Sequence, residues 1–421
     1  MSTLKFSQFG EKLGGDCGIL ELMDDLGKAL EEGGMRMMGG GNPALIPEVV
    51  DIFQNRLATI ASSKDEVAQM LGIYQPPQGG ALTIEALAAF LQRQYNWDIT
   101  PDNIAVTSGG QTAFFLLFNM LGGTTSKGAH KRILLPLTPE YIGYANQGVT
   151  PDLFHARPPK VTYRDDGFFK YGIDFDQLTV GRDIGAICVS RPTNPTGNVL
   201  TDAEMTRLAD IAEEHEIPLI VDNAYGAPFP HILFEDIQPA WTPNRILTMS
   251  LSKLGLPGTR TAFVVGSPEV IRRISAANCV LNLANNNLGQ ALIRDMLIDD
   301  SILSLSHQVI RPFYENRSRQ AIAWVREAFG TEIPVEIHRS EGALFLWLRF
   351  PKLPISSAEL YQRLKARKVL VVSGHYFFFG LTEPHEHEHQ CLRMTFSQTA
   401  EVVHEGIAIL ADEVGRVFAE A

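Results

Sequence analysis

Residues 250–260 read SLSKLGLPGTR and continue an apolar run that begins at residue 246, which predicts a strand. Lys253 therefore lies just after a strand, among small and hydroxyl-bearing residues and close in sequence to Arg260. Apolar surroundings and a nearby cation both disfavour the charged form of a lysine. A neutral amine is a nucleophile that can form a Schiff base with an aldehyde or ketone. Taken alone, the stretch fits a surface lysine in a Gly/Pro turn equally well.

Two other stretches combine a strand end with polar residues. Residues 217–225 read IPLIVDNAY, a buried-strand run that ends in Asp222 and places Tyr225 three residues later. Residues 189–197 read VSRPTNPTG, a strand end followed by a turn that contains Asn194. Asn-Pro-x-Gly, Asp-x-x-Tyr and Ser-x-Ser-Lys, in this order, resemble the fold-type I aminotransferases that use pyridoxal 5'-phosphate (PLP). The similarity extends from the GGGNP stretch at residues 39–43 to Arg393.

The resemblance implies a role for each of these residues. Lys253 would bind PLP covalently and act as acid and base, Asp222 would keep the pyridine nitrogen protonated, and Tyr225 would bond the ring oxygen. The other implied contacts are those of the phosphate (Gly110, Gln111, Ser250, Arg260 and Tyr74 of the partner subunit), the ring (Tyr141 and Asn194) and the substrate α-carboxylate (Arg393, Asn194 and Gly41). An arginine suits a carboxylate because its planar fork pairs both oxygens.

Some of these positions have a physical rationale of their own. Residues 104–118 read as strand, glycine turn and helix, and the N-terminus of a helix favours an anion, so a phosphate is reasonable at Gly110 and Gln111. The alternative is that the glycines serve the turn only. Without the resemblance, Tyr141 reads as ordinary core, Tyr74 as a packed loop residue and residues 39–41 as a flexible turn.

The apolar runs at residues 184–189 and 219–221 do not alternate, which is typical of parallel strands covered on both faces. An amphipathic helix at residues 202–215 separates them and predicts an α/β fold. The resemblance adds a large PLP domain at 49–287, with a mostly parallel, seven-stranded-type sheet between helices. It also adds a smaller α+β domain formed by 1–48 and 288–421. Residues 150–185 are expected to form an antiparallel excursion without chemistry.

Composition narrows the class of protein and its partners. The chain has 421 residues and a net charge of −12, with no long basic run, which argues against nucleic acid and anionic membranes as main partners. The four cysteines, which lack metal or disulfide spacing, are expected to be buried thiols in a reducing cytoplasm (Cys17, Cys188, Cys279 and Cys391). No signal peptide or bilayer-spanning stretch is evident.

The HEHEH stretch at residues 385–389 raises a metal hypothesis, because imidazole is a common ligand. His385, His387 and His389 would share one face of a strand, but the stretch also reads as a solvated loop. The expected chemistry needs no metal.

The resemblance implies a ping-pong transfer of the amino group of valine to pyruvate, giving 2-oxoisovalerate and alanine. It also implies a homodimer with shared sites. Ile19 and Tyr141 are expected to form an apolar wall, and no arginine is assigned to a side-chain acid. The alternatives are a broader aromatic or branched-chain aminotransferase, a PLP lyase, and a PLP-binding regulator without catalysis. A regulator of that kind carries an N-terminal DNA-binding domain, whereas here the PLP module begins almost at once.

Overall fold

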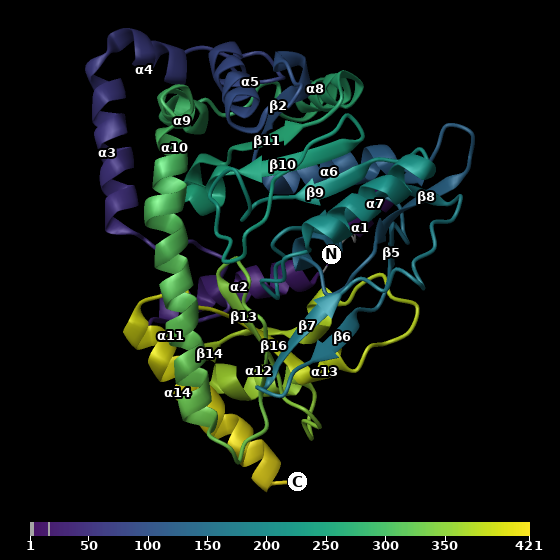
Figure 1. Ribbon diagram of the computed structural model, residues 1–421, viewed down its shortest axis with the longest axis vertical. Helices are drawn as coiled ribbons and strands as arrows, with labels where there is room; N and C mark the ends of the chain where they lie inside the picture. The colour runs from purple at the N-terminus through teal and green to yellow at the C-terminus, as the bar shows by residue number, and fades with distance from the viewer. Residues whose placement is uncertain (1–3, 16) are drawn as a thin grey trace.

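The computed structural model describes residues 4–15 and 17–421 and contains two large sheets with helices around them (Figure 1). The first sheet occupies the upper half of the molecule in this view, and the second lies in the lower half. A single cluster of buried apolar residues extends through both halves.

The first sheet has eight strands, and its central strands are parallel. In order across the sheet, with β5 paired to β4, the strands are β2 (Ile104–Thr107), β11 (Ala262–Val265), β10 (Arg245–Ser250), β9 (Leu219–Asp222), β8 (Ile184–Ser190), β4 (His130–Leu135), β3 (Gly123–Thr124) and β5 (Phe154–Ala156). Only β11 and β3 run against their neighbours. The register aligns Ser190, Asp222 and Thr248, so the carboxyl ends of β8, β9 and β10 meet at one edge.

Helices cover both faces of this sheet. Along β8, Ile187 and Val189 pack in one apolar cluster, whereas the intervening Ala186 and Cys188 pack in another. The first cluster contains side chains of α5 (Ala81–Tyr95) and α7 (Asp202–Glu214), and the second contains those of α6 (Gly110–Leu121) and α8 (Pro268–Asn282). Burial on both faces explains why these strands are continuously apolar, and it confirms the α/β class.

The second sheet mixes strands from distant parts of the chain. Its order is β15 (Val372–Ser373), β16 (Cys391–Thr395), β13 (Phe345–Arg349), β12 (Glu336–His338), β7 (Phe168–Gly172) and β6 (Lys160–Tyr163). The β6–β7 hairpin is antiparallel, but β7 pairs in parallel with β12. Figure 1 shows this teal hairpin among the yellow-green C-terminal elements. The hairpin therefore belongs to the sheet of the chain ends, although the expected range 49–287 includes it; the domain boundaries stay a prediction.

A column of helices links the two halves along one side of the molecule. It consists of α9 (Leu288–Ile298), α10 (Ser301–Ser304), a π-helical turn at Leu305–Ile310 and α11 (Arg311–Phe329). Figure 1 shows α11 extending down to α14 (Ala400–Ala419), with which it packs. The remaining elements are α1 (Gln8–Leu13), α2 (Gly18–Glu32), β1 (Arg36–Met37), α3 (Pro47–Ser62), α4 (Lys64–Leu71), α12 (Ser357–Ala366), β14 (Val369–Leu370) and α13 (His387–Gln390).

Two further expectations can be compared with the fold. Cys188 and Cys391 are buried thiols as expected, whereas Cys17 is only partly buried. Cys279 is exposed on α8, because it lies off the buried side of the helix that carries Asn278. In the part of the chain that the structure describes, no helix has the length and apolar content needed to cross a bilayer.

Candidate active site

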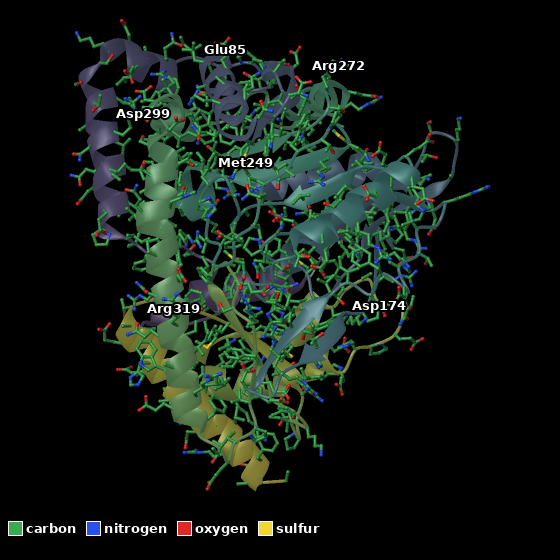
Figure 2. All side chains as sticks on the ribbon, in the orientation of Figure 1. Glu85, Asp174, Met249, Arg272, Asp299 and Arg319 are labelled. Carbon is green, nitrogen blue, oxygen red and sulfur yellow. The ribbon has the colours of Figure 1, made fainter. Side chains whose placement is uncertain are left out.

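A cavity of about 660 Å³ opens at the edge where β8, β9 and β10 end. Figure 2 shows Met249, a cavity residue of β10, inside the molecule, whereas Glu85 and Arg272 lie at its periphery. Eleven of the twelve residues expected in the site line this cavity: Gly41, Gly110, Gln111, Tyr141, Asn194, Asp222, Tyr225, Ser250, Lys253, Arg260 and Arg393. The fold therefore brings together residues from seven separate stretches of the sequence.

Lys253 lies on a short 3₁₀ helix, Leu251–Leu254, directly after β10. Its Nζ donates a hydrogen bond to the carbonyl oxygen of Gly41. Burial, together with the guanidinium groups of Arg393 and Arg260, lowers the pKa of Lys253 to about 8. A sizeable fraction of the amine is thus neutral near physiological pH, as a nucleophile requires.

Asp222 is the last residue of β9, and it accepts two hydrogen bonds from the protein. Oδ1 accepts from the backbone N–H of Ala224 at 2.9 Å, and Oδ2 accepts from the hydroxyl of Tyr144. Burial raises the pKa of Asp222, and the hydrogen bonds from Tyr144 and Ala224 oppose this shift. Tyr144 was not expected in the site. The signal available in the sequence was its place three residues after Tyr141, in a stretch already assigned to the ring.

Arg393 connects the second sheet to the first. From β16, its Nη1 donates to Oδ1 of Asn194 at 2.7 Å and its Nη2 donates to the carbonyl oxygen of Gly39 at 2.6 Å. The guanidinium lies 4.2 Å from the centre of the Phe345 ring, and its Nε is buried without a partner among the described residues. A buried arginine with an unused donor is a ready binder of a carboxylate.

The N-terminus of α6 and Arg260 together form an anion-binding corner. No side chain of the described residues caps this helix, whose N-cap Gly109 has a φ of 84°. A Cβ at Gly109 would lie 2.2 Å from Nη2 of Arg260, so the guanidinium packs directly against the helix start. The Gln111 side chain donates to Gly143 at 2.9 Å, which leaves its backbone N–H as the group available to an anion.

Aromatic side chains form part of the cavity wall. Tyr225 is 5% exposed, and burial raises its pKa, so its hydroxyl stays protonated and can donate. Its ring centre lies 5.4 Å from Nζ of Lys253. Tyr141 packs edge-on against Tyr144, with 5.2 Å between ring centres.

The helix α2 closes one side of the cavity with apolar side chains. Ile19, Leu22 and Met23 line the cavity together with Tyr141, which agrees with the expected apolar wall. Polar contacts hold the helix against the second half: Tyr376 donates to Glu21 at 2.7 Å, and Asp25 accepts from Lys365 at 2.6 Å and from Tyr361.

Tyr74 and Arg191 lie outside the cavity lining. Tyr74 is 81% exposed. Arg191, which had no assignment, donates to Asp202 at 2.6 Å and to the carbonyl oxygen of Leu200 at 2.7 Å. Its guanidinium is therefore already paired away from the cavity.

The histidine stretch forms neither a strand nor a fully solvated loop. His387 begins α13 and is 0% exposed, and its ring bonds Tyr171 at 2.7 Å and Tyr163 at 3.0 Å. His385 stacks on Phe378, and His389 pairs with Glu388. Within residues 4–15 and 17–421, no group of three or more potential ligands is placed to hold a metal.

These features define a member of the class I and II aminotransferases, and the chain belongs to this family, whose model matches residues 52–410. Valine–pyruvate aminotransferase of Escherichia coli K12 is 46% identical over 418 residues, which cover 99% of this chain and 100% of that protein. A solved aminotransferase from Psychrobacter arcticum 273-4 is 43% identical, covers both chains fully and has a TM-score of 0.96. The valine–pyruvate aminotransferase of Salmonella typhimurium LT2 is 46% identical, covers 96% of this chain and 100% of its own, and has a TM-score of 0.89.

Proposed function

We propose that this protein transfers the amino group of valine to pyruvate in two half-reactions, giving 2-oxoisovalerate and alanine. The observation that carries the proposal is a single cavity that holds a lysine of lowered pKa, the half-buried carboxylate of Asp222 and the buried Arg393 beside an apolar helix face. The Escherichia coli and Salmonella relatives named for this reaction support the choice of substrates.

The residues of the cavity fit PLP. The anion corner of α6 and Arg260 suits the phosphate, with Ser250 beside it, and Asp222 suits the pyridine nitrogen. Tyr225 and Asn194 would bond the ring oxygen, and Tyr141 would pack on the ring. When bound, PLP supplies an electron sink that stabilises negative charge at the substrate α-carbon.

The protein itself supplies the proton transfers and the substrate contacts. Nζ of Lys253 is the group that would take a proton from the α-carbon of the amino donor in the first half-reaction. In the second half-reaction it would give a proton to the α-carbon of the acceptor. Asp222 would hold a proton on the pyridine nitrogen. Arg393 and Asn194 would bind the α-carboxylate, and Gly41 would offer its backbone to the same group.

The apolar wall on α2 supports a small aliphatic donor. A dicarboxylate would place its second charge against Ile19 and Leu22, and Arg191 is paired with Asp202 instead of facing the cavity. Burying an unpaired carboxylate costs several kcal/mol. Aspartate and glutamate are therefore poor donors in this proposal.

The proposed enzyme is a homodimer whose subunits share their sites. Segments 71–77 and 282–287 lie side by side, because Asn287 bonds the carbonyl oxygen of Ile73 at 3.0 Å and Asn285 bonds that of Pro77 at 2.9 Å. They expose a patch of large apolar side chains: Leu71, Ile73, Tyr74 and Leu283. A second copy of the chain that covers this patch would bring Tyr74 to the partner's phosphate. The reduced, unpaired cysteines support the cytoplasm as its location.

The test is a matrix of amino donors against pyruvate and 2-oxoglutarate, together with the visible spectrum of the purified protein. We expect a yellow protein, bleached by borohydride with the adduct on Lys253, and the highest kcat/KM for valine with pyruvate. Faster turnover of phenylalanine or tyrosine would favour the broader aromatic alternative. Elimination products without amino transfer would favour the lyase.

A further inference from the structure

Glu140 is an acidic residue that the reaction described above does not use. It lies between Pro139 and Tyr141, is 3% exposed and is absent from the cavity lining. Oε1 accepts from the backbone N–H of Ser190 at 2.9 Å. Oε2 accepts from the Ser190 hydroxyl at 2.7 Å and from the backbone N–H of Tyr141 at 3.1 Å. All three donors are neutral, so these contacts leave the carboxylate without a cation.

Glu140 belongs to the same buried network as Asp222. The Ser190 hydroxyl, which donates to Glu140, lies 3.5 Å from the hydroxyl of Tyr144. Tyr144 in turn donates to Asp222. Because Ser190 commits its proton to Glu140, the proton of Tyr144 remains directed at Asp222. Two acids thus share one hydrogen-bonded network, whose members Glu140, Ser190 and Tyr144 are buried. Charges interact more strongly in such surroundings than in solvent.

We propose that Glu140 is a positioning residue that acts through Ser190 and Tyr144 and adds a second negative charge behind Asp222. This charge stabilises the proton on the pyridine nitrogen of bound PLP. The inference rests on the proposed function, since it requires the cofactor in this cavity. In this proposal two carboxylates, those of Asp222 and Glu140, stabilise the ring proton that makes the cofactor an electron sink.

The protonation of Glu140 gives the effect a pH dependence. Burial raises the pKa of Glu140 to about 7, and the charge of Asp222 contributes to the shift. The other titratable groups that face it are Tyr144 and Cys188, both neutral because burial raises their pKa values. Glu140 is therefore neutral below about pH 7 and charged above it. The stabilisation of the ring proton grows as the pH rises through this value.

A purely structural role is the competing explanation. Glu140 also holds the end of β8, where the carbonyl oxygen of Ser190 accepts from the Thr193 hydroxyl at 3.1 Å. Loss of Glu140 would then loosen the Asn194 turn and weaken cofactor binding without any change at the ring nitrogen. Glu341 is a matched control, because it is 2% exposed and accepts from Lys170 at 2.5 Å and from the N–H of Val199 at 3.0 Å.

The experiment loads the enzyme with PLP labelled with nitrogen-15 in the ring and follows the ring-nitrogen NMR shift against pH. The wild type, Glu140→Gln, Glu140→Asp and Glu341→Gln are compared, with the dissociation constant for PLP measured in parallel. We expect Glu140→Gln to lower the pKa of the ring nitrogen by about one unit. Glu140→Asp, which keeps the charge, recovers most of the shift, and Glu341→Gln has no effect on the ring nitrogen.

A ring-nitrogen titration of Glu140→Gln that superimposes on the wild type overturns the proposal, even where PLP binds less tightly. If Glu140→Gln does not fold, Ser190→Ala decides, because this variant removes the hydroxyl through which Glu140 reaches Tyr144. A lowered ring-nitrogen pKa then supports the proposal, and a wild-type titration overturns it. A wild-type protein that binds no PLP refutes the proposed function first, and this inference with it.

Discussion

Nη1 of Arg393 lies 2.7 Å from Oδ1 of Asn194, and this contact joins β16 of the second sheet to the turn that follows β8 of the first. The two residues expected to bind the substrate α-carboxylate are thus already in contact, and they come from opposite halves of the molecule. The carboxylate site therefore depends on how the two halves pack.

Arg393→Lys tests this carboxylate site. The variant keeps the positive charge but loses the planar fork, so kcat/KM falls about 10–100-fold for valine and alanine alike. Steady-state kinetics with both donors measure the effect. Arg191→Lys is the control, because Arg191 pairs with Asp202 outside the cavity and its replacement leaves kcat/KM for both donors close to the wild-type values. An Arg393→Lys enzyme with wild-type kcat/KM for valine would exclude Arg393 from the site.

Ile19→Ala tests the apolar wall on α2. Valine loses a contact with its branched side chain, whereas alanine, which is shorter, loses little, so the valine-to-alanine ratio of kcat/KM falls about 5–20-fold. Leu20→Ala, on the same helix but exposed and outside the cavity, keeps the wild-type ratio. An equal loss for both donors would mean that Ile19 supports the fold of the site and does not contact the side chain.

The lowered pKa of Lys253 predicts how the stability of the cofactor-free protein depends on pH. Burial lowers the pKa from 10.5 to about 8, so the folded state holds this proton less tightly than the unfolded state. The buried, protonated amine therefore lowers the free energy of unfolding. This loss of stability is complete below about pH 8 and disappears as the pH rises towards 10.5. Lys253→Met therefore stabilises the cofactor-free protein by about 1–3 kcal/mol at pH 7.

Urea unfolding at pH 7, 8, 9 and 10 measures this difference, which shrinks as the pH rises. Lys160, which is exposed on β6, provides the control, and Lys160→Met leaves the pH dependence as in the wild type. A Lys253→Met difference that stays constant from pH 7 to 10 would show that packing, and not charge, separates the two proteins.

Hybrid dimers test the shared site. One parent carries Lys253→Ala and the other Tyr74→Ala, and each is assayed alone at limiting PLP and after mixing through reversible unfolding. If Tyr74 acts in the partner's site, the hybrid contains one site with both native residues, and activity rises above that of either parent. If activity does not rise on mixing, although mass spectrometry verifies that hybrids have formed, then Tyr74 either acts in its own subunit or has no role in the site.

The sequence indicated which residues meet at one edge of the first sheet, because each of its motifs lies at the end of a strand. Their roles in the reaction stay predictions. Asp222 ends β9 and Lys253 follows β10, and the parallel register then places them at the same edge without further information. Chemistry that depends on the end of a single strand can be inferred from local patterns and motif order.

Contacts between distant segments could not be inferred in this way. The hydrogen bond from Tyr144 to Asp222 joins residues far apart in the sequence, and the place of this tyrosine three residues after Tyr141 does not show which group it bonds. The pairing of β7 with β12 is another contact between distant segments. The pairing of Arg191 with Asp202 is closer in the sequence, but it also depends on how the chain folds after β8. The exposure of Cys279 depends on which face of α8 packs on the sheet, and composition does not specify it.

The β6–β7 hairpin has a consequence for the order in which the protein is synthesised. All eight strands of the first sheet lie between residues 104 and 265, so that sheet can be completed while the C-terminal part is still on the ribosome. The hairpin at 160–172 leaves the ribosome within this interval, but its neighbour β12 begins only at Glu336. During that delay β7 exposes an unpaired strand edge, the kind of surface that recruits other chains. A nascent chain stalled before residue 336 is therefore the species in which aggregation or chaperone binding is to be sought.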